Sequence, residues 1–199
     1  FFFNSINTIS ALIRVNSEKA RKLLIELSHF FRSNLQGARK SLIPLEQELS
    51  QVNAYLALEK ARFPDRYKID IQVEEGLEDA LFPPFSIQVL VENSLRHAFK
   101  NRRTDNLVLI RIYKDGNIIN ASVSDNGFGI DKEILPYVGK VEVQSKEGSG
   151  SALENLNKRL IGLFSEDAAL KIDSGPRGTT VSFKIPYRKD GDNSESSHS

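Results

Sequence analysis

Two stretches decide the fold: Gln88–Phe99, which reads QVLVENSLRHAF, and Asp125–Ile130, which reads DNGFGI. Around the first, apolar residues recur at spacings of three and four, the pattern of an amphipathic helix. They are Ile87, Leu90, Val91, Leu95 and Ala98. The second stretch is a glycine-rich turn that follows a predicted strand at Asn120–Ser124. The two stretches together predict a helix and a turn that present polar groups to one ligand.

The polar side of this helix carries Asn93 and Arg96, and the turn begins with Asp125. An amide oxygen is a suitable hard ligand for Mg²⁺, which keeps phosphate and water in its other positions. Arg96 lies on the same face and can reach a phosphate. A purine needs an acceptor for its exocyclic amine, and the carboxylate of Asp125 supplies one. The pattern predicts an ATP site without a Walker loop, because no GxxxxGK[ST] occurs in the chain.

Glycines complete the predicted site. Gly127 and Gly129 let the backbone pass close to the base. Gly148 and Gly150 precede a helix predicted at Leu153–Phe164, and there they offer backbone N–H groups and a positive helix end to phosphates. Each motif alone is weak evidence for an ATP site, but in this order and at these spacings the motifs together are strong evidence.

Each polar residue also has a purely structural interpretation. Asn93 can be a polar residue on a solvated helix face, and Asp125 can be an ordinary turn aspartate. Glu92 is either an exposed helix charge or a base that polarises the attacking group. His97 is interpreted as a packing residue rather than a ligand.

The composition bounds the class of protein. With 199 residues, 40% hydrophobic and 27% charged, the chain has the composition of a soluble globular protein. It shows no apolar run of about 18 residues and no signal peptide. It lacks cysteine, so disulfides and thiolate metal sites are excluded, and its net charge of +1 argues against direct nucleic-acid binding. The start at Phe1-Phe2-Phe3 and the lack of methionine lead us to expect the natural start upstream.

Residues 1–62 read as three amphipathic helices. The first two carry apolar stripes, with the second ending at Gly37, and the third runs from Leu45 to Arg62 before Pro64. The stripes consist of Ile6, Ile9, Leu12 and Ile13, then Ala20, Leu23, Leu24, Leu27, Phe30 and Phe31, then Leu49, Val52, Leu56 and Leu58. Three such helices bury little by themselves. They form either a cap on the following domain or half of a dimeric bundle, and we favour the bundle.

From Tyr67 onward the hydrophobic period changes to that of strands. The Asp115-Gly116 pair predicts a hairpin, and 138–149 is expected to be a mobile loop. The predicted elements are strands at Lys68–Val73, Asn106–Tyr113, Asn117–Ser124, Ala168–Ser174 and Thr179–Pro186, a short helix at Asp131–Tyr137, and a disordered tail at 188–199.

The motifs resemble those of a known family. VENSLRH (91–97), DNGFGI (125–130), GSGSALENL (148–156) and GTTVSFKIP (178–186) resemble the N box, G1 box, G2 box and last strand of the GHKL ATPases, which include gyrase and histidine kinases. FFFNSINTISALI, LSHFFRSNL and PLEQELSQVNAYLALEKARFPDRY resemble the LytS/YehU-type sensor histidine kinases, whose phosphoacceptor motif reads P-H-F-x-F-N. The resemblance covers residues 1 to about 187.

The resemblance implies a role for each matching residue. These roles are Mg²⁺ binding for Asn93, adenine binding for Asp125, phosphate proximity for Arg96, the G1 glycines for Gly127 and Gly129, the G2 glycines for Gly148 and Gly150, and adenine proximity for Thr180. Residues 131–149 match the ATP lid. The family's Ile-Gly-Leu after the G2 box is Ser151-Ala152-Leu153 here.

The catalytic base and the phosphoacceptor depart from the family pattern. Many GHKL proteins carry an acidic or amide residue four positions before the asparagine, where this chain has Val89. Glu92 is therefore the nearest candidate base. The phosphoacceptor histidine would directly precede Phe1, and His29 does not match it.

The resemblance implies an α+β fold: an N-terminal helical dimerisation segment (1–62) followed by a GHKL (Bergerat) α/β sandwich with a mixed sheet (63–187). It implies a two-component histidine kinase core that binds Mg·ATP, phosphorylates a histidine and passes the phosphoryl group to a response-regulator aspartate. We expect a homodimer, a response regulator of the LytTR type and a position on the cytoplasmic side of the membrane, with membrane contact only through an upstream region. The alternatives are a GHKL ATPase that drives a clamp, and a nucleotide-binding pseudokinase or interaction module.

Overall fold

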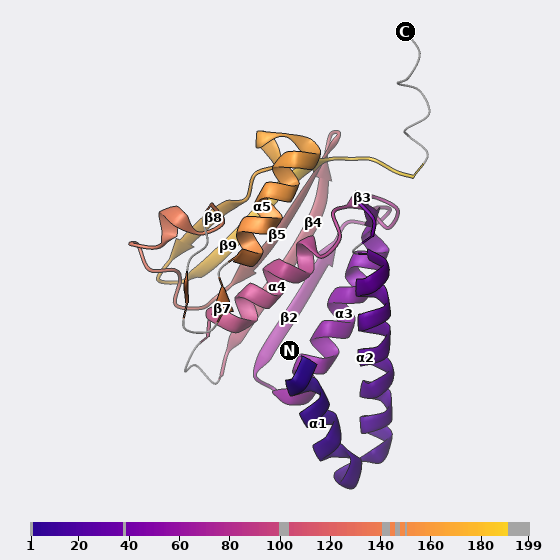
Figure 1. The fold of residues 1–199 in the computed structure, drawn as a ribbon. Helices are drawn as coiled ribbons and strands as arrows, with labels where there is room; N and C mark the ends of the chain where they lie inside the picture. Colours follow the sequence, from indigo (N-terminus) through magenta and orange to yellow (C-terminus); the bar gives the residue numbers. More distant parts are fainter. Residues whose placement is uncertain are drawn as a thin grey trace.

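The computed structural model describes residues 2–37, 39–99, 104–140, 144–145, 148–149 and 151–190 (Figure 1). The helices are α1 (Phe2–Val15), α2 (Ser17–Gly37), α3 (Leu45–Arg62), α4 (Ser86–His97) and α5 (Ser151–Phe164), with 3₁₀ turns η1 (Leu135–Tyr137) and η2 (Glu166–Ala168). The strands are β1 (Ile43–Pro44), β2 (Tyr67–Val73), β3 (Leu81–Phe82), β4 (Asn106–Asp115), β5 (Ile118–Asp125), β6 (Gln144–Ser145), β7 (Gly148–Ser149), β8 (Lys171–Gly175) and β9 (Gly178–Pro186).

A five-stranded mixed sheet has the order β2-β4-β5-β9-β8. β2 runs parallel to β4, and the other neighbours are antiparallel. β4 and β5 form the predicted hairpin, in which Gly116 has a φ of 59°. This left-handed conformation suits glycine and explains the Asp-Gly signal at the turn.

One face of this sheet carries the core. Every second residue of the central strands is buried, as the period of two along a strand requires: Val108, Ile110, Ile112, Ile119, Ala121, Val123, Val181, Phe183 and Ile185. α4 and α5 lie across this face (Figure 1), and the predicted apolar stripe of α4 joins the same core. The α/β sandwich with a mixed sheet predicted from the sequence is confirmed.

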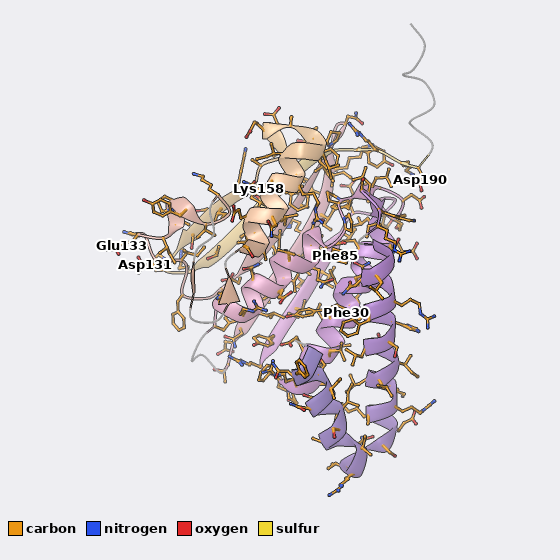
Figure 2. The ribbon with its side chains drawn as sticks, in the orientation of Figure 1. Phe30, Phe85, Asp131, Glu133, Lys158 and Asp190 are labelled. Carbon is orange, nitrogen blue, oxygen red and sulfur yellow. The ribbon has the colours of Figure 1, made fainter. Side chains whose placement is uncertain are left out.

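The N-terminal helices share α3 with the sandwich. Leu58 of α3 packs in a small cluster with α1 and α2 residues, including Ile9 and Leu23. Farther toward its start, α3 contributes Val52 and Tyr55 to the main core. Phe30 of α2, labelled in Figure 2, stacks beside Tyr55 with ring centroids 6.4 Å apart. By its packing, α3 therefore belongs both to the N-terminal helices and to the sandwich. Its observed bounds, Leu45–Arg62, are the predicted ones.

The other sides of α1 and α2 are apolar and exposed. Ile13 is 58% exposed and Leu24 is 53% exposed, although both belong to the predicted stripes. The apolar surfaces of α1 and α2 are therefore wider than the part that packs against α3. Within the described ranges, no helix is long and apolar enough to cross a membrane.

Some element boundaries differ from the sequence predictions. The helix predicted at Asp131–Tyr137 is reduced to η1, and the strand predicted from Ala168 begins at Lys171. Ala168 lies instead in η2, where its N–H donates to the carbonyl of Ser165 and its side chain is buried. Local 3₁₀ hydrogen bonding therefore replaces strand pairing at Ala168.

The predicted loop and tail are described only in part. Within 138–149, β6 pairs with β7, and residues 141–143 and 146–147 lie outside the described residues. Beyond Tyr187, the carbonyl of Arg188 accepts from the N–H of Leu81, and Lys189 forms a bridge with Ala80. Residues 191–199 lie outside the described residues, so the mobility of the loop and the disorder of the tail remain predictions.

Candidate nucleotide-binding site

Asp125 ends β5 with its carboxyl group held by several donors. Its Oδ1 accepts from the backbone N–H of Gly127 at 2.9 Å and of Thr179 at 3.2 Å. The side chain of Ser94, on α4, also hydrogen-bonds this carboxyl group. Burial raises the pKa of Asp125 above its ordinary value, and the three hydrogen bonds lower it in part. The structure thus joins the helix and the turn that the sequence analysis singled out.

The structure places Thr179, and not the predicted Thr180, beside Asp125. Thr179 pairs with Asp125 across β5 and β9 and is buried on the helix-covered face. Thr180 pairs with Ser124 in the next register position, and their hydroxyl oxygens lie 2.8 Å apart. Because successive side chains of a strand point to opposite faces, Thr180 lies on the face away from the carboxyl group of Asp125. The geometry therefore favours Thr179 over Thr180 as the last-strand threonine nearest Asp125, and which of the two lies near the adenine stays a prediction.

Asn93 is half-buried on α4, one turn after Val89. Its Nδ2 donates to the carbonyl of Val89 at 2.8 Å. With the amide nitrogen engaged in this way, the oxygen Oδ1 is the atom available as a ligand. That is the atom type that Mg²⁺ takes from an amide.

Glu92 and Arg96 form an ion pair on α4. The guanidinium Nη2 lies 2.6 Å from Oε1 of Glu92, at the i,i+4 spacing that brings helix residues together. The pair is partly exposed, so its contribution to stability is small. The carboxylate predicted as a base is thus engaged by the guanidinium predicted to contact phosphate.

Gly127 and Gly129 have backbone neighbours on the side where a Cβ would lie. A Cβ on Gly127 would stand 2.3 Å from the carbonyl oxygen of Ala98, and one on Gly129 would stand 2.2 Å from that of Gly175. Gly129 also has a φ of 77°. These glycines let the turn pack against the end of α4 and against β8, which the sequence analysis did not foresee.

Two further polar residues hold the turn in place. Asn126 accepts from the N–H of Leu107 and donates to the carbonyl of Asp105, so it ties the turn to the start of β4. Ser174 accepts from the N–H of Ile130, and its hydroxyl oxygen lies 2.8 Å from that of Thr179. Sequence reasoning missed both, although the Asx-type bonding of an asparagine in a turn is a recognisable signal for Asn126.

The G2 box is only partly visible. Gly148 lies in β7, where it pairs with Ser145 of β6, and Gly150 lies outside the described residues. α5 begins at Ser151, directly after the box and two residues before the predicted start. Among the described residues, no group of three or more His, Asp or Glu is arranged to hold a metal ion.

Two family models match the chain. The histidine kinase model matches residues 1–67. The model described as histidine kinase-, DNA gyrase B- and HSP90-like ATPase matches residues 84–189, which is more than half of the chain. The chain belongs to this ATPase family. Asn93, Asp125 and Thr179 all lie within the residues matched to it.

Curated relatives of this ATPase family are sensor proteins. The chain is 58% identical over 186 residues to the sensor protein LytS of Staphylococcus haemolyticus. It is 54% identical over 190 residues to the sensor histidine kinase/phosphatase LytS of Staphylococcus aureus. These matches cover 94% and 95% of the chain, which spans about a third (32%) of the length of either relative. The predicted resemblance to LytS-type sensor kinases is confirmed.

Solved histidine kinase structures share the fold. The histidine kinase domain of a blue-light activated histidine kinase of Erythrobacter litoralis has a TM-score of 0.55 at 21% identity, covering 89% of this chain and 85% of that one. The mycobacterial sensor histidine kinase MprB has a TM-score of 0.54 at 20% identity, covering 74% of this chain and 97% of that one. At these identities the likeness supports the α+β architecture, in which the N-terminal helices precede the sandwich.

Proposed function

We propose that the chain is the kinase core of a two-component sensor that binds Mg·ATP and transfers the γ-phosphoryl group to a histidine and then to a response-regulator aspartate. The observation that carries the proposal is the carboxyl group of Asp125 fixed between α4, the turn and β9. The LytS-type relatives and the two matched family models support it.

The adenine end of the proposed site is Asp125. A carboxylate has about four acceptor positions, and the partners of the Asp125 carboxyl group here are the backbone N–H groups of Gly127 and Thr179 and the side chain of Ser94. Acceptor capacity therefore remains for the exocyclic amine of adenine. Guanine, which carries a carbonyl at the corresponding position, would place an acceptor against an acceptor.

The phosphate end is built from α4 and the start of α5. Asn93 would hold Mg²⁺ through Oδ1, because its amide nitrogen already donates to Val89. Bound Mg²⁺ would neutralise charge on the phosphates. Arg96, with Gly148 and Gly150 before α5, would contact phosphate oxygens, as helix N-termini and guanidinium groups do.

In the proposed transfer, an imidazole nitrogen forms a bond to the γ-phosphorus while the bond to the β–γ bridging oxygen breaks, and ADP leaves. The chain's contribution is to position the nucleotide and exclude alternative geometries. Glu92 would orient the attacking imidazole, and its ion pair with Arg96 links that role to the phosphate contact. The acceptor histidine is expected directly before Phe1.

The partners follow from the same proposal. The exposed apolar side chains of α1 and α2, among them Ile13 and Leu24, support a homodimer through these helices. The phosphoryl group would pass to a response regulator, expected to be of the LytTR type. In the full-length protein this core would lie on the cytoplasmic side of the membrane.

Nucleotide titration tests the site. Asp125→Ala should lower ATP affinity by about 5- to 150-fold, because a buried purine donor then lacks its acceptor at a cost of about 1–3 kcal/mol. Asp173→Ala removes an exposed carboxylate from the edge strand β8, which is separated from β5 by β9, and should leave the affinity unchanged. Calorimetric titration with ATP and GTP measures both, and equal ATP affinity of wild type and Asp125→Ala would refute the assignment.

Labelling tests the reaction. A chain extended upstream to include the expected Pro-His should form acid-labile phosphohistidine from [γ-³²P]ATP, and the 199-residue chain should not. ADP release without label in the extended chain would favour the ATPase alternative. Phosphotransfer that persists when ATP binding is abolished would favour the pseudokinase alternative.

A further inference from the structure

Glu48 of α3 is a fully buried carboxyl group that bonds the start of another helix. Its Oε2 accepts from the N–H of Phe85 at 2.7 Å, and its Oε1 accepts from those of Ile87 at 2.8 Å and Gln88 at 3.2 Å. Its exposed fraction is 0%. A buried carboxyl group needs such partners, because it would otherwise carry the full cost of lost hydration.

The first turn of α4 depends on this carboxyl group. A helix leaves its first backbone N–H groups without partners inside the helix. The N-cap residue, Phe85, provides no side-chain hydrogen bond and has a φ of 65°, which is unusual for a residue other than glycine. Figure 2 labels Phe85 at this junction. Glu48 therefore acts as the cap of α4 across a sequence separation of 37 to 40 residues.

α4 is the helix that carries the nucleotide residues. Asn93 and Arg96 lie on it, and Ser94 connects it to the carboxyl group of Asp125. α3, at the other end of the link, packs through Leu58 against α1 and α2. The bonds of Glu48 are thus a direct connection between the N-terminal helices and the proposed nucleotide site.

We propose that Glu48 is a positioning residue of the kinase, which fixes the start of α4 to α3 and thereby sets the placement of Asn93 relative to Asp125. The inference rests on the proposed Mg·ATP site. It adds a residue outside the N, G1 and G2 boxes, and it gives the N-terminal helices a hydrogen-bonded route to that site.

The charge of Glu48 makes this link sensitive to pH. Burial raises the pKa of Glu48 to about 7, while the three backbone donors and the charge of Arg159 on α5 lower it in part. A carboxylate accepts hydrogen bonds more strongly than a neutral acid. The connection to α4 is therefore firmer in the ionised form, which predominates above pH 7.

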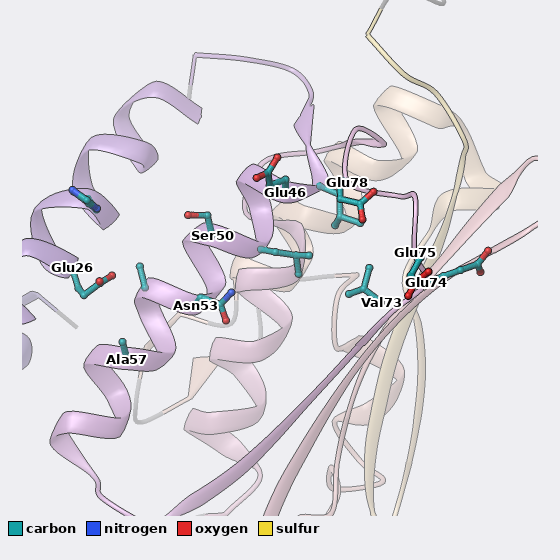
Figure 3. Close-up of a pocket in the computed structure, with 13 residues that line it drawn as sticks. Glu26, Glu46, Ser50, Asn53, Ala57, Val73, Glu74, Glu75 and Glu78 are labelled. Carbon is teal, nitrogen blue, oxygen red and sulfur yellow. The ribbon is translucent and has the colours of Figure 1, made fainter.

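Glu48→Gln and Glu46→Gln form a matched pair for the test. Both remove a glutamate from the first turn of α3, but Glu46 is exposed on the rim of a groove of about 690 Å³ between α2, α3 and the chain after β2 (Figure 3). In Glu48→Gln, one oxygen becomes an NH₂ group that cannot accept from the N–H groups at the start of α4. We expect Mg·ATP affinity at pH 8 to fall about fivefold or more in Glu48→Gln, the lower end of typical site coupling, and to stay unchanged in Glu46→Gln.

The pH profile separates positioning from folding. Between pH 8 and pH 6, a group with a pKa of about 7 changes from about 90% to about 10% ionised. Glu46→Gln keeps the titrating carboxyl group of Glu48, and Glu48→Gln lacks it. From pH 8 to pH 6, the Mg·ATP affinity of Glu46→Gln should therefore fall by up to about tenfold more than the Mg·ATP affinity of Glu48→Gln. The nucleotide itself titrates identically with both variants, so its own protonation cancels in the comparison.

The outcomes are distinct. Equal affinities and equal pH profiles of the two variants, with a lower melting temperature for Glu48→Gln, would show that Glu48 serves the fold alone and would overturn the inference. Failure of the wild type to bind Mg·ATP would overturn the proposed function as well. If Glu48→Gln does not fold, hydrogen exchange of the wild type decides: Mg·ATP should increase protection of the Ile87 and Gln88 amides, and unchanged protection would refute the link.

Discussion

Replacing Gly127 by alanine tests how closely the turn after β5 packs on α4. The added Cβ would lie 2.3 Å from the carbonyl oxygen of Ala98 and 2.6 Å from its Cβ. Favourable contacts between carbon atoms begin at about 3.5 Å, so the turn and the end of α4 would have to separate by on the order of 1 Å. The Ala98 carbonyl also accepts from the N–H of Phe128 at 3.1 Å, and this separation would stretch that bond.

The expected cost of Gly127→Ala is about 1–3 kcal/mol, the usual penalty for overpacking. For a chain of this size, that lowers the melting temperature by about 2–12 °C. Gly162→Ala is the matched control, since Gly162 lies within α5 and a Cβ there has no neighbour within 4 Å. In a helix interior, alanine is favoured over glycine by about 0.5–1 kcal/mol. The two substitutions should therefore have opposite signs.

Thermal and denaturant unfolding measure both variants, and ATP titration follows for Gly127→Ala. Because the separation also pulls α4 away from Asp125, nucleotide affinity should fall together with stability. If Gly127→Ala is as stable as the wild type and binds ATP equally well, the close approach to Ala98 is not a constraint, and the reasoning about the turn is refuted.

Three further predictions concern single side chains. Asn93→Ala should reduce the tightening of nucleotide binding by Mg²⁺ while adenosine binding barely changes; full Mg²⁺ dependence in the variant would move the metal elsewhere. Thr179→Val should weaken ATP binding more than Thr180→Val, and the reverse order in the same titration would restore the original assignment. Because the folded-state pKa of Glu48 is raised from 4.5 to about 7, its ionisation costs stability as the pH rises through this window. The unfolding free energy of Glu48→Gln relative to wild type should therefore increase by up to about 3 kcal/mol between pH 4 and pH 8, and a flat difference in urea titrations would contradict the buried charge.

Local patterns predicted the parts of the fold that depend on local physics. The three-and-four spacing around Leu90 gave the buried face of α4, and Asp115-Gly116 gave the hairpin, because helix period and turn conformation are set by neighbouring residues. The strand predicted from Ala168 begins only at Lys171, because Ala168 forms a local hydrogen bond to Ser165 in η2 instead of pairing in the sheet. Family resemblance, and not periodicity, supplied the mixed order of the sheet.

The threonine beside Asp125 could have been placed from the sequence. In GTTVSFKIP, the apolar residues Val181 and Phe183 alternate, so the position two before Val181 lies on the same face. That position is Thr179, which the structure buries next to Asp125. Matching the motif to the family located the strand, but only the period of two decides which threonine points toward the helix layer.

Glu48 shows what the sequence can and cannot predict about a buried charge. Glu46 and Glu48 both lie in the first turn of α3, where the helix dipole favours either carboxylate. Glu48, however, stands three residues after Leu45 and four before Val52, on the stripe that is buried. A charge on an apolar stripe has to find partners in another element, and this chain provides them at the start of α4. The sequence can therefore indicate that Glu48 has a tertiary partner, while the identity of that partner requires the fold, because 37 or more residues separate the two ends of the bond.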